Sequence, residues 1–171
     1  MITTKRLTLR KPSPTDLLDV FVIHADPVNN QFNPAGPDES LEDSQQRLGQ
    51  WIEDWEETGI GYFVVENKGL VVGFAGVREA NTAHWGEEAE DVLNIYYLFA
   101  PEVQGHGFAG EAIKAVIEYA KEQRPSRSIS LVTIPENAAA IGFAKHLGFE
   151  FLRYIETNVV NAEYRHTEHN H

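Results

Sequence analysis

The stretch PEVQGHGFAGEA, residues 101–112, decides how this chain folds. It follows the apolar and aromatic run VLNIYYLF, residues 92–99, whose composition predicts a strand. It leads into AIKAVIEYAKEQ, residues 112–123, whose apolar residues recur with helical spacing. Three glycines between a strand and a helix leave backbone N–H groups open at the positive end of the helix. Such an arrangement binds phosphate.

One interpretation of the glycines is a dinucleotide site, because Gly105, Gly107 and Gly110 match G-x-G-x-x-G. That fingerprint belongs in the tight turn after the first strand of a doubly wound sheet. Here residues 101–103 separate the strand from the glycines, and only 61 residues remain beyond Gly110. A nucleotide-binding domain is therefore the weaker alternative.

A second interpretation uses the pattern Gln-x-x-Gly-x-Ala, formed by Gln104, Gly107 and Ala109. A later block, NAAAIGFAKHLGF at residues 137–149, has an asparagine that opens a helix ending in Leu-Gly-Phe. Together the two motifs resemble the GNAT N-acyltransferase superfamily, whose pyrophosphate loop holds the diphosphate of acetyl-coenzyme A. The segments ITTKRLTLRKPSPTD, residues 2–16, and NVVNAEYRHTEH, residues 158–169, resemble the branch that includes ribosomal-protein N-terminal acetyltransferases.

The resemblance covers nearly the whole chain and implies an α/β (α+β) fold, the GNAT fold, in a single domain over residues 1–171. We expect a mixed central sheet of about seven strands, flanked by about four helices and splayed between the fourth and fifth strands. The strands are predicted at residues 6–11, 61–66, 70–78, 92–99, 128–134, 149–160 and 164–167. The last two form a hairpin that turns at residues 161–163.

Composition excludes several classes of protein. The chain has no cysteine, and its net charge of −12 argues against a nucleic acid partner, whose phosphates need Lys and Arg. No apolar run approaches the ~18 residues that span a membrane, so we expect no membrane partner and a cytoplasmic protein. His166, His169 and His171 cluster near the end, but a frayed tail explains them better than a metal site. We expect no metal.

The acidic residues are unevenly placed. Residues 38–57 contain eight carboxylates against one arginine, and Glu87, Glu88, Glu90 and Asp91 form a second cluster. The simpler interpretation is a solvated helix face, since Leu48, Trp51 and other apolar residues already make the first segment amphipathic. The alternative is a surface that attracts a cationic amine.

The resemblance also implies which residues hold the cofactor. The strand before the glycines would pair its backbone with the pantetheine arm, and one of its amides would polarise the thioester carbonyl. The diphosphate would lie on the glycine amides. His106 could add a donor there, and Phe108 would pack the loop onto the core. The implied cofactor-binding residues are Tyr97, Leu98, Phe99, Ala100, Gln104, Gly105, His106, Gly107, Phe108, Ala109, Gly110, Asn137, Phe143 and Lys145.

The catalytic side chains of the superfamily are less evident. Where many relatives carry a glutamate base, this chain has Asn94, which cannot act as a base. Strand alternation puts Glu90 and Tyr96 on the same face, so these are the nearest titratable candidates. Ala144 stands where some relatives have a tyrosine acid, and Ala140 where the N-terminal acetyltransferase branch often has serine.

These observations predict an acetyl-CoA-dependent N-acetyltransferase that acts by direct transfer, without a covalent enzyme intermediate. The acceptor would be a cationic primary amine: a small amine, an antibiotic-like amine or a protein N-terminus. A homodimer remains open. The missing catalytic groups favour one rival from another class, a non-catalytic acyl-CoA-binding or sensing module on the same fold.

Overall fold

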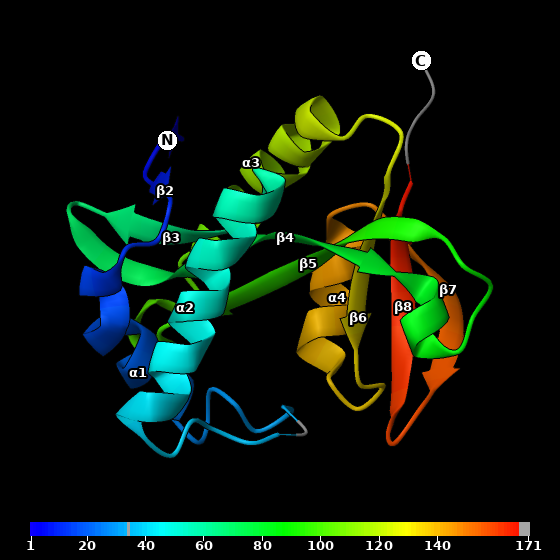
Figure 1. Ribbon diagram of the computed structural model, residues 1–171, viewed down its shortest axis with the longest axis horizontal. Coiled ribbons are helices and arrows are strands. Elements are labelled where there is room, and N and C mark those ends of the chain that lie inside the picture. The colour runs from blue at the N-terminus through cyan, green and yellow to red at the C-terminus, as the bar shows by residue number, and fades with distance from the viewer. Residues whose placement is uncertain (34, 168–171) are drawn as a thin grey trace. The chain divides into compact units, whose positions relative to one another are not determined.

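The computed structural model describes residues 1–33 and 35–167 (Figure 1). Its α-helices are α1 (Leu17–Ala25), α2 (Leu41–Thr58), α3 (Phe108–Gln123) and α4 (Ala138–His146). The 3₁₀ turns are η1 (Pro14–Asp16), η2 (Thr82–Trp85) and η3 (Pro101–Val103). The strands are β1 (Ile2–Thr3), β2 (Thr8–Arg10), β3 (Tyr62–Asn67), β4 (Leu70–Asn81), β5 (Asp91–Phe99), β6 (Ser128–Thr133), β7 (Phe149–Glu156) and β8 (Val160–His166).

The strands form one mixed sheet in the order β1-β2-β3-β4-β5-β6-β8-β7, which confirms the predicted fold class. The sheet has eight strands where about seven were expected, because the two-residue strand β1 pairs with β2. β5 and β6 are parallel and pair at three positions, ending with Asn94 opposite Ser130. Pairing over only three positions agrees with the predicted splay between these two strands.

The chain divides into two compact units that interleave in sequence. The first contains residues 1–78 and 96–116, and the second contains residues 79–95 and 117–171. β5 passes from the second unit into the first after Ile95. The single domain expected from the sequence stays a prediction.

The first unit is built around a core shared by two helices and the adjacent strands. Val20 and Ile23 of α1 and Leu48 and Trp51 of α2 bury their side chains against Tyr62, Val64 and Phe74. Figure 1 shows α2 lying in front of β3 and β4. The start and end of α2 follow the sequence signals: Ser40 accepts a hydrogen bond from the Asp43 amide, and Gly59 ends the helix at φ 72°.

The β3–β4 hairpin closes with a two-residue turn. Asn67 pairs with Leu70, so Lys68 and Gly69 alone form the turn. Their φ angles are 52° and 79°, the values of a type I′ turn, which needs positive φ at both central positions. Glycine adopts such a backbone freely, whereas Lys68 does so at a cost.

The second unit contains the β7–β8 hairpin, and here the predicted turn is wrong. The sequence placed it at residues 161–163, but Glu156 pairs with Val160 and the connection lies at residues 157–159. Glu163 is fully buried, and its carboxylate accepts hydrogen bonds from Ser130, Arg153 and Arg165. An acidic residue that would suit a turn is thus a strand residue, because three partners from β6, β7 and β8 satisfy it.

Two further differences concern local boundaries. α3 begins at Phe108, four residues before the predicted start, because the glycine segment already follows the helical path. The connection between β4 and β5 contains the turn η2, which Asn81 caps by accepting from the Ala83 amide. Across residues 1–33 and 35–167, none of the helices has the length and apolar character needed to cross a bilayer.

Candidate functional site

The glycine segment, residues 104–110, turns the chain from β5 into α3. Gly105 and Gly107 have φ angles of 87° and 78°, which side-chain-bearing residues rarely adopt. The first hydrogen bond of α3 runs from the Glu111 amide to the Gly107 carbonyl at 3.1 Å. The two glycines therefore reverse the chain tightly enough for a 16-residue helix to begin at once.

The first turn of α3 presents unused backbone donors. The amides of Phe108, Ala109 and Gly110 make no hydrogen bond to any residue that the structure describes. Gly105 and Gly107 are solvent-exposed. Open amides at a helix N-terminus, together with the helix dipole, form a site for an anion such as a phosphate group.

Gln104 braces this segment from the side. Its amide Nε2 donates to Asn29 Oδ1 at 2.8 Å and to the Phe99 carbonyl at 3.2 Å. The side chain thus ties the start of the loop to the end of β5 and to the connection after α1. Gln104 therefore supports the loop. Its effect on a ligand is indirect, because it orients the backbone amides that follow it.

An ion pair that the sequence did not reveal supports the other side of the segment. Arg6 Nε lies 2.7 Å from Glu111 Oε1, and Arg6 Nη1 donates to the His106 carbonyl at 2.8 Å. Thr4 and the Arg6 amide bind the second carboxylate oxygen. Burial raises the pKa of Glu111, but the hydrogen bonds from Thr4 and Arg6 outweigh it, and the pKa is lowered overall. An ionised Glu111 therefore neutralises Arg6.

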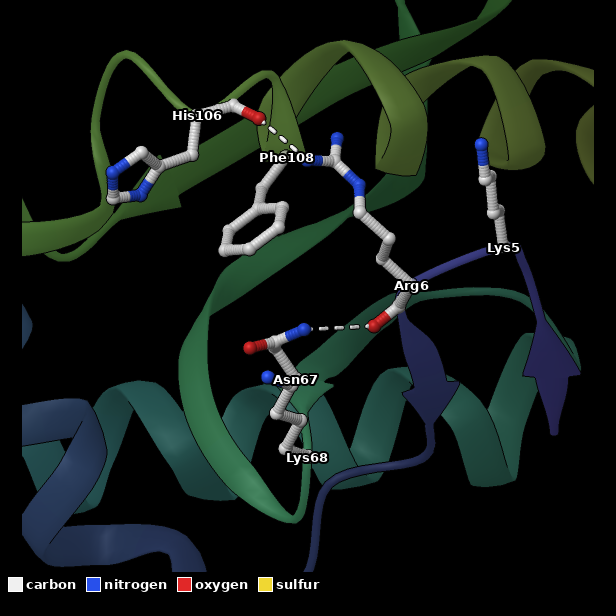
Figure 2. A pocket seen from close by; sticks show the side chains of 6 residues that line it. All are labelled: Lys5, Arg6, Asn67, Lys68, His106 and Phe108. Carbon is white, nitrogen blue, oxygen red and sulfur yellow. Dashed lines mark hydrogen bonds between the residues drawn. The ribbon is translucent and has the colours of Figure 1, made fainter.

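Phe108 faces the N-terminal segment of the chain. Its ring is half-buried and lies under the Arg6 guanidinium, 4.7 Å from ring centroid to Cζ (Figure 2). The exposed ring of His106 meets its edge at 5.8 Å between centroids. The reason is the helix start at Phe108, which directs this side chain towards the N-terminal strands.

The end of β5 brings Tyr97, Leu98, Phe99 and Ala100 to the start of the same segment. The Ala100 amide donates to the Val72 carbonyl at 2.8 Å, so it is already used. Phe99 is buried beside Gly73 of β4, where an added Cβ would stand 2.5 Å from the Phe99 ring. The absence of a side chain at Gly73 therefore fixes Phe99 immediately before the loop.

Tyr96 is half-buried and packs against an aromatic cluster of the first unit. Its ring stacks on Tyr62 at 4.7 Å, and its hydroxyl makes a short hydrogen bond to His24 Nε2. His24 Nδ1 lies 2.8 Å from the Val20 carbonyl, which identifies Nδ1 as the protonated nitrogen. Tyr96 therefore donates to Nε2 and keeps its own lone pairs free for a further donor.

The pKa values of this pair are moved by burial. Burial, followed by the charge of Arg47, lowers the pKa of His24 to about 4, and burial raises the pKa of Tyr96. Both groups are therefore neutral at pH 7. No role for His24 is predicted from the sequence, although it lies on the same helical face as the buried Val20 and Ile23.

The other two residues considered for catalysis, Asn94 of β5 and Glu90 just before it, lie in the second unit. Both carboxylate oxygens of Glu90 contact the Arg165 guanidinium, at 3.1 and 3.3 Å, and Ser128 lies 3.4 Å away. The Asn94 Oδ1 atom is buried and has no hydrogen-bond partner among the described residues. A buried acceptor without a donor is unusual and indicates a water molecule or a ligand N–H group.

The remaining cofactor candidates, on α4, also belong to the second unit. Asn137 caps this helix, since its Oδ1 accepts from the Ala140 amide at 3.1 Å. Phe143 is half-buried and Lys145 is exposed. Ala140 and Ala144 are buried, so the two positions that lack the hydroxyl groups of some relatives face inward.

The acidic segment at residues 38–57 is partly neutralised. Asp38 is buried and pairs with Arg47 at 2.8 Å, and Asp54 pairs with Arg78 at 3.0 Å. The other carboxylates are exposed, and hydrogen bonding with Glu53 raises the pKa of Glu57. The segment is thus mostly a solvated helix face that carries uncompensated negative charge.

Within the described part of the chain, no cluster of His, Asp and Glu could hold a metal ion, and His169 and His171 lie outside that part.

A family model described as an acetyltransferase (GNAT) domain matches residues 6–150 of this sequence. The chain belongs to the GNAT acetyltransferase family. The match contains the glycine segment, and family membership therefore decides against the dinucleotide interpretation of its glycines.

Individual relatives agree with this assignment. An uncharacterized N-acetyltransferase of Methanocaldococcus jannaschii, MJ1207, is 34% identical over 111 residues. These cover 62% of this chain and 47% of that protein, so the chain spans about half the length of this relative.

Solved GNAT structures share the fold. A spermidine N-acetyltransferase from Vibrio cholerae, in complex with CoA and spermine, is 22% identical with a TM-score of 0.74 and 95% of each chain covered. RimL, a ribosomal L7/L12 alpha-N-protein acetyltransferase, is 12% identical with a TM-score of 0.79, covering 96% of this chain and 91% of that one. At these identities the likeness concerns the fold alone, and the resemblance to the ribosomal-protein branch stays a prediction.

Proposed function

We propose that this GNAT protein is an N-acetyltransferase that moves the acetyl group of acetyl-CoA to a primary amine. The observation that carries the proposal is the set of open amides at Phe108, Ala109 and Gly110, at the start of α3. They lie within the family match and form a site for the cofactor diphosphate. Gln104, the flanking glycines and Arg6 hold this backbone in place.

The thioester would lie along the end of β5. Its carbonyl needs a donor aimed at the oxygen that becomes negative in the transition state, which is worth about 3–4 kcal/mol in other acyl transfers. The Ala100 amide already binds Val72, so we assign the donor to the backbone of Tyr97, Leu98 or Phe99. The amine nitrogen attacks the carbonyl carbon, the C–S bond breaks, and CoA leaves as a thiolate.

The amine must lose a proton before it attacks, since an alkylammonium has a pKa of about 10.4. Asn94 Oδ1 and the Tyr96 hydroxyl each offer an acceptor, and strand alternation puts both on one face of β5. Neither is a base at neutral pH. We propose that the Tyr96 hydroxyl orients the amine and that a water molecule carries its proton away. By strand alternation, Glu90 is the nearest carboxylate in sequence on that face.

The acceptor is expected to be cationic before it reacts. The exposed carboxylates of residues 38–57 support this, as does the spermine in the neighbouring Vibrio cholerae structure. RimL extends the candidates to a protein N-terminus. Polyamines, amine-bearing antibiotics and peptides with a free N-terminus are therefore the three classes to compare.

The experiment is a thiol-release assay with acetyl-CoA and a panel from these classes. We expect acetyl-amine product, verified by mass spectrometry, with at least one class. The matched control is the same panel with each amine already acetylated, for which no thiol release is expected.

The missing catalytic side chains favour one alternative, a non-catalytic module that binds acyl-CoA. It predicts tight CoA binding with no turnover of any amine. Binding of CoA without thiol release across the whole panel would replace the enzyme by the module, and absence of CoA binding would contradict both.

A further inference from the structure

His24, near the end of α1, is a buried histidine that takes no part in the proposed reaction. It is only 1% exposed, and its ring contacts Trp51 and Phe74 at 5.5 and 5.4 Å between centroids. A polar ring is costly to bury among aromatic side chains unless its nitrogens find hydrogen-bond partners. Both nitrogens of His24 have one, and the partner of Nε2 is the Tyr96 hydroxyl.

The orientation of the imidazole is fixed from several directions. The His24 carbonyl accepts hydrogen bonds from the Asp38 amide at 2.8 Å and from Asn30 Nδ2 at 3.0 Å. Nδ1 lies 2.8 Å from the Val20 carbonyl, which can only accept, so Nδ1 carries the proton of the neutral ring. Nε2 is therefore a lone-pair acceptor that faces the Tyr96 hydroxyl.

The Tyr96 ring is held as well. It stacks on Tyr62 with centroids 4.7 Å apart, and it lies 5.9 Å from Trp51. The hydroxyl has one proton, which His24 Nε2 accepts. No other residue in the ranges 1–33 and 35–167 forms a hydrogen bond with this hydroxyl, so its lone pairs are open.

The tautomer of His24 decides which way the Tyr96 proton points. If the imidazole proton were on Nε2, Tyr96 would accept it and would turn its own proton to the other side. Nδ1 and the Val20 carbonyl would then be two acceptors 2.8 Å apart with no proton between them. The Val20 carbonyl thus selects the tautomer, and the tautomer sets the hydrogen-bond direction of the hydroxyl.

The charge of the ring agrees with this arrangement. Burial, followed by the charge of Arg47, lowers the pKa of His24 to about 4, so Nε2 is unprotonated at neutral pH. Arg47 is itself paired with Asp38 at 2.8 Å, so the two side chains together add little net charge. Tyr96 therefore donates to Nε2 under the conditions in which an amine can react.

We infer that His24 is a positioning residue, which holds the Tyr96 hydroxyl as a hydrogen-bond acceptor for an N–H group of the amine substrate. This inference rests on the proposed function, in which the Tyr96 hydroxyl orients the amine. An amine held through its N–H group keeps the nitrogen lone pair for the thioester carbon. A hydroxyl that donated to the nitrogen would occupy that lone pair and block the attack.

The test replaces His24 in two ways and measures kcat/KM for the amine of the panel with the highest turnover. His24→Leu has no hydrogen-bond acceptor, so the Tyr96 proton turns towards the amine. We expect kcat/KM for that amine to fall at least tenfold, while the KM of acetyl-CoA stays within twofold. His24→Gln keeps an oxygen that can accept the Tyr96 proton, and its kcat/KM should stay within threefold of the unmodified protein.

A second substitution separates positioning from folding. Tyr96→Phe removes the hydroxyl together with its proton, so the double variant His24→Leu/Tyr96→Phe should match Tyr96→Phe alone within twofold. The double variant should therefore be more active than His24→Leu, because it contains no misdirected proton. A histidine with a purely structural role would lower activity by the same factor with or without the Tyr96 hydroxyl. The control His84→Leu makes the same change at an exposed histidine and should keep full activity.

Histidine ¹⁵N NMR spectra test the hydrogen-bond direction without any turnover. The His24 signals, identified by their absence in His24→Gln, should show the proton on Nδ1 at pH 7. A proton on Nε2 would overturn the inference. So would an unchanged kcat/KM in His24→Leu, or a double variant no more active than His24→Leu. If the unmodified protein acetylates no amine, the proposed function fails and the inference with it, a result visible before any variant is compared.

Discussion

The glycine segment and the His24–Tyr96 cluster differ in the groups they offer: backbone amides in the segment and side chains in the cluster. The segment offers backbone amides, held by glycines with positive φ and by the Arg6–Glu111 pair. The cluster offers side chains whose hydrogen bonds and pKa values depend on burial by α1, α2 and three strands. A backbone site should therefore respond to changes in local geometry, whereas the cluster should respond to pH and to loss of a partner.

The largest effect is expected in the cluster, from acid. The pKa of His24 is lowered to about 4 in the folded protein, against about 6.5 for an ordinary histidine. The unfolded chain therefore binds more protons between these values, and stability falls as the pH drops from about 6.5 towards 4. The expected loss from His24 approaches about 3 kcal/mol.

Urea unfolding at pH 7 and pH 4.5 measures this loss. The decrease in unfolding free energy should be smaller by about 2–3 kcal/mol in His24→Gln. The exposed His84 provides the control His84→Gln, which should behave like the unmodified protein. An equal decrease in all three would show that His24 is not the titrating group.

The next effect tests the backbone site. Gly107→Asp adds a negative side chain at φ 78°, where an added Cβ would lie 3.3 Å from Arg6 Nη2. Affinity for CoA should fall by more than tenfold, or above about 1.4 kcal/mol. Gly107→Asn, a residue that tolerates positive φ, should lose less, since it adds no charge. Unchanged calorimetric affinity in the aspartate variant would remove the segment from the site.

A smaller effect is expected on turnover from the side chains of β5. Tyr96→Phe and Glu90→Gln should each lower kcat by less than tenfold, because juxtaposition and the backbone donor survive both changes. A dedicated acid or base contributes typically 10²–10⁴-fold. A loss of kcat above roughly a thousandfold, with CoA affinity intact, would identify such a catalyst. It would contradict the expectation that juxtaposition and the backbone donor supply most of the rate enhancement.

The smallest effect concerns attraction of the acceptor. If the exposed carboxylates of residues 38–57 attract a cationic amine, kcat/KM should fall a few-fold between low salt and 1 M, where the Debye length is about 3 Å. An acceptor without charge serves as the control and should show little change. A salt-independent kcat/KM for the cationic amine, or a preference for acidic acceptors, would refute the attraction.

The sequence was sufficient wherever local chemistry decides the structure. The Gln104, Gly107 and Ala109 pattern predicted the strand–loop–helix connection, and the limits of α2 lie at a serine and a glycine that suit the two ends of a helix. These features depend on backbone conformation and on neighbours close in the chain.

The sequence was insufficient where the partner is distant. Arg6 and Glu111 are 105 residues apart, and His24 and Tyr96 are 72 apart, so no local pattern joins them. Glu163 misled the prediction of the last turn for the same reason, because its partner Ser130 is 33 positions away. The roles of Glu90 and Tyr96 as catalytic candidates stay a prediction.

The buried Glu163 also determines how the last hairpin can join the sheet. Side chains alternate along a strand, so a slip of one residue in β8 would turn this carboxylate away from Ser130 and Arg153. A charge left without partners in the interior costs several kcal/mol, so a slip of one residue is strongly disfavoured. β7 is the edge strand and carries exposed Phe151, Leu152 and Tyr154, a composition prone to edge-to-edge association. An edge strand with an exposed apolar surface is thus paired with a strand whose alignment is fixed by a buried carboxylate.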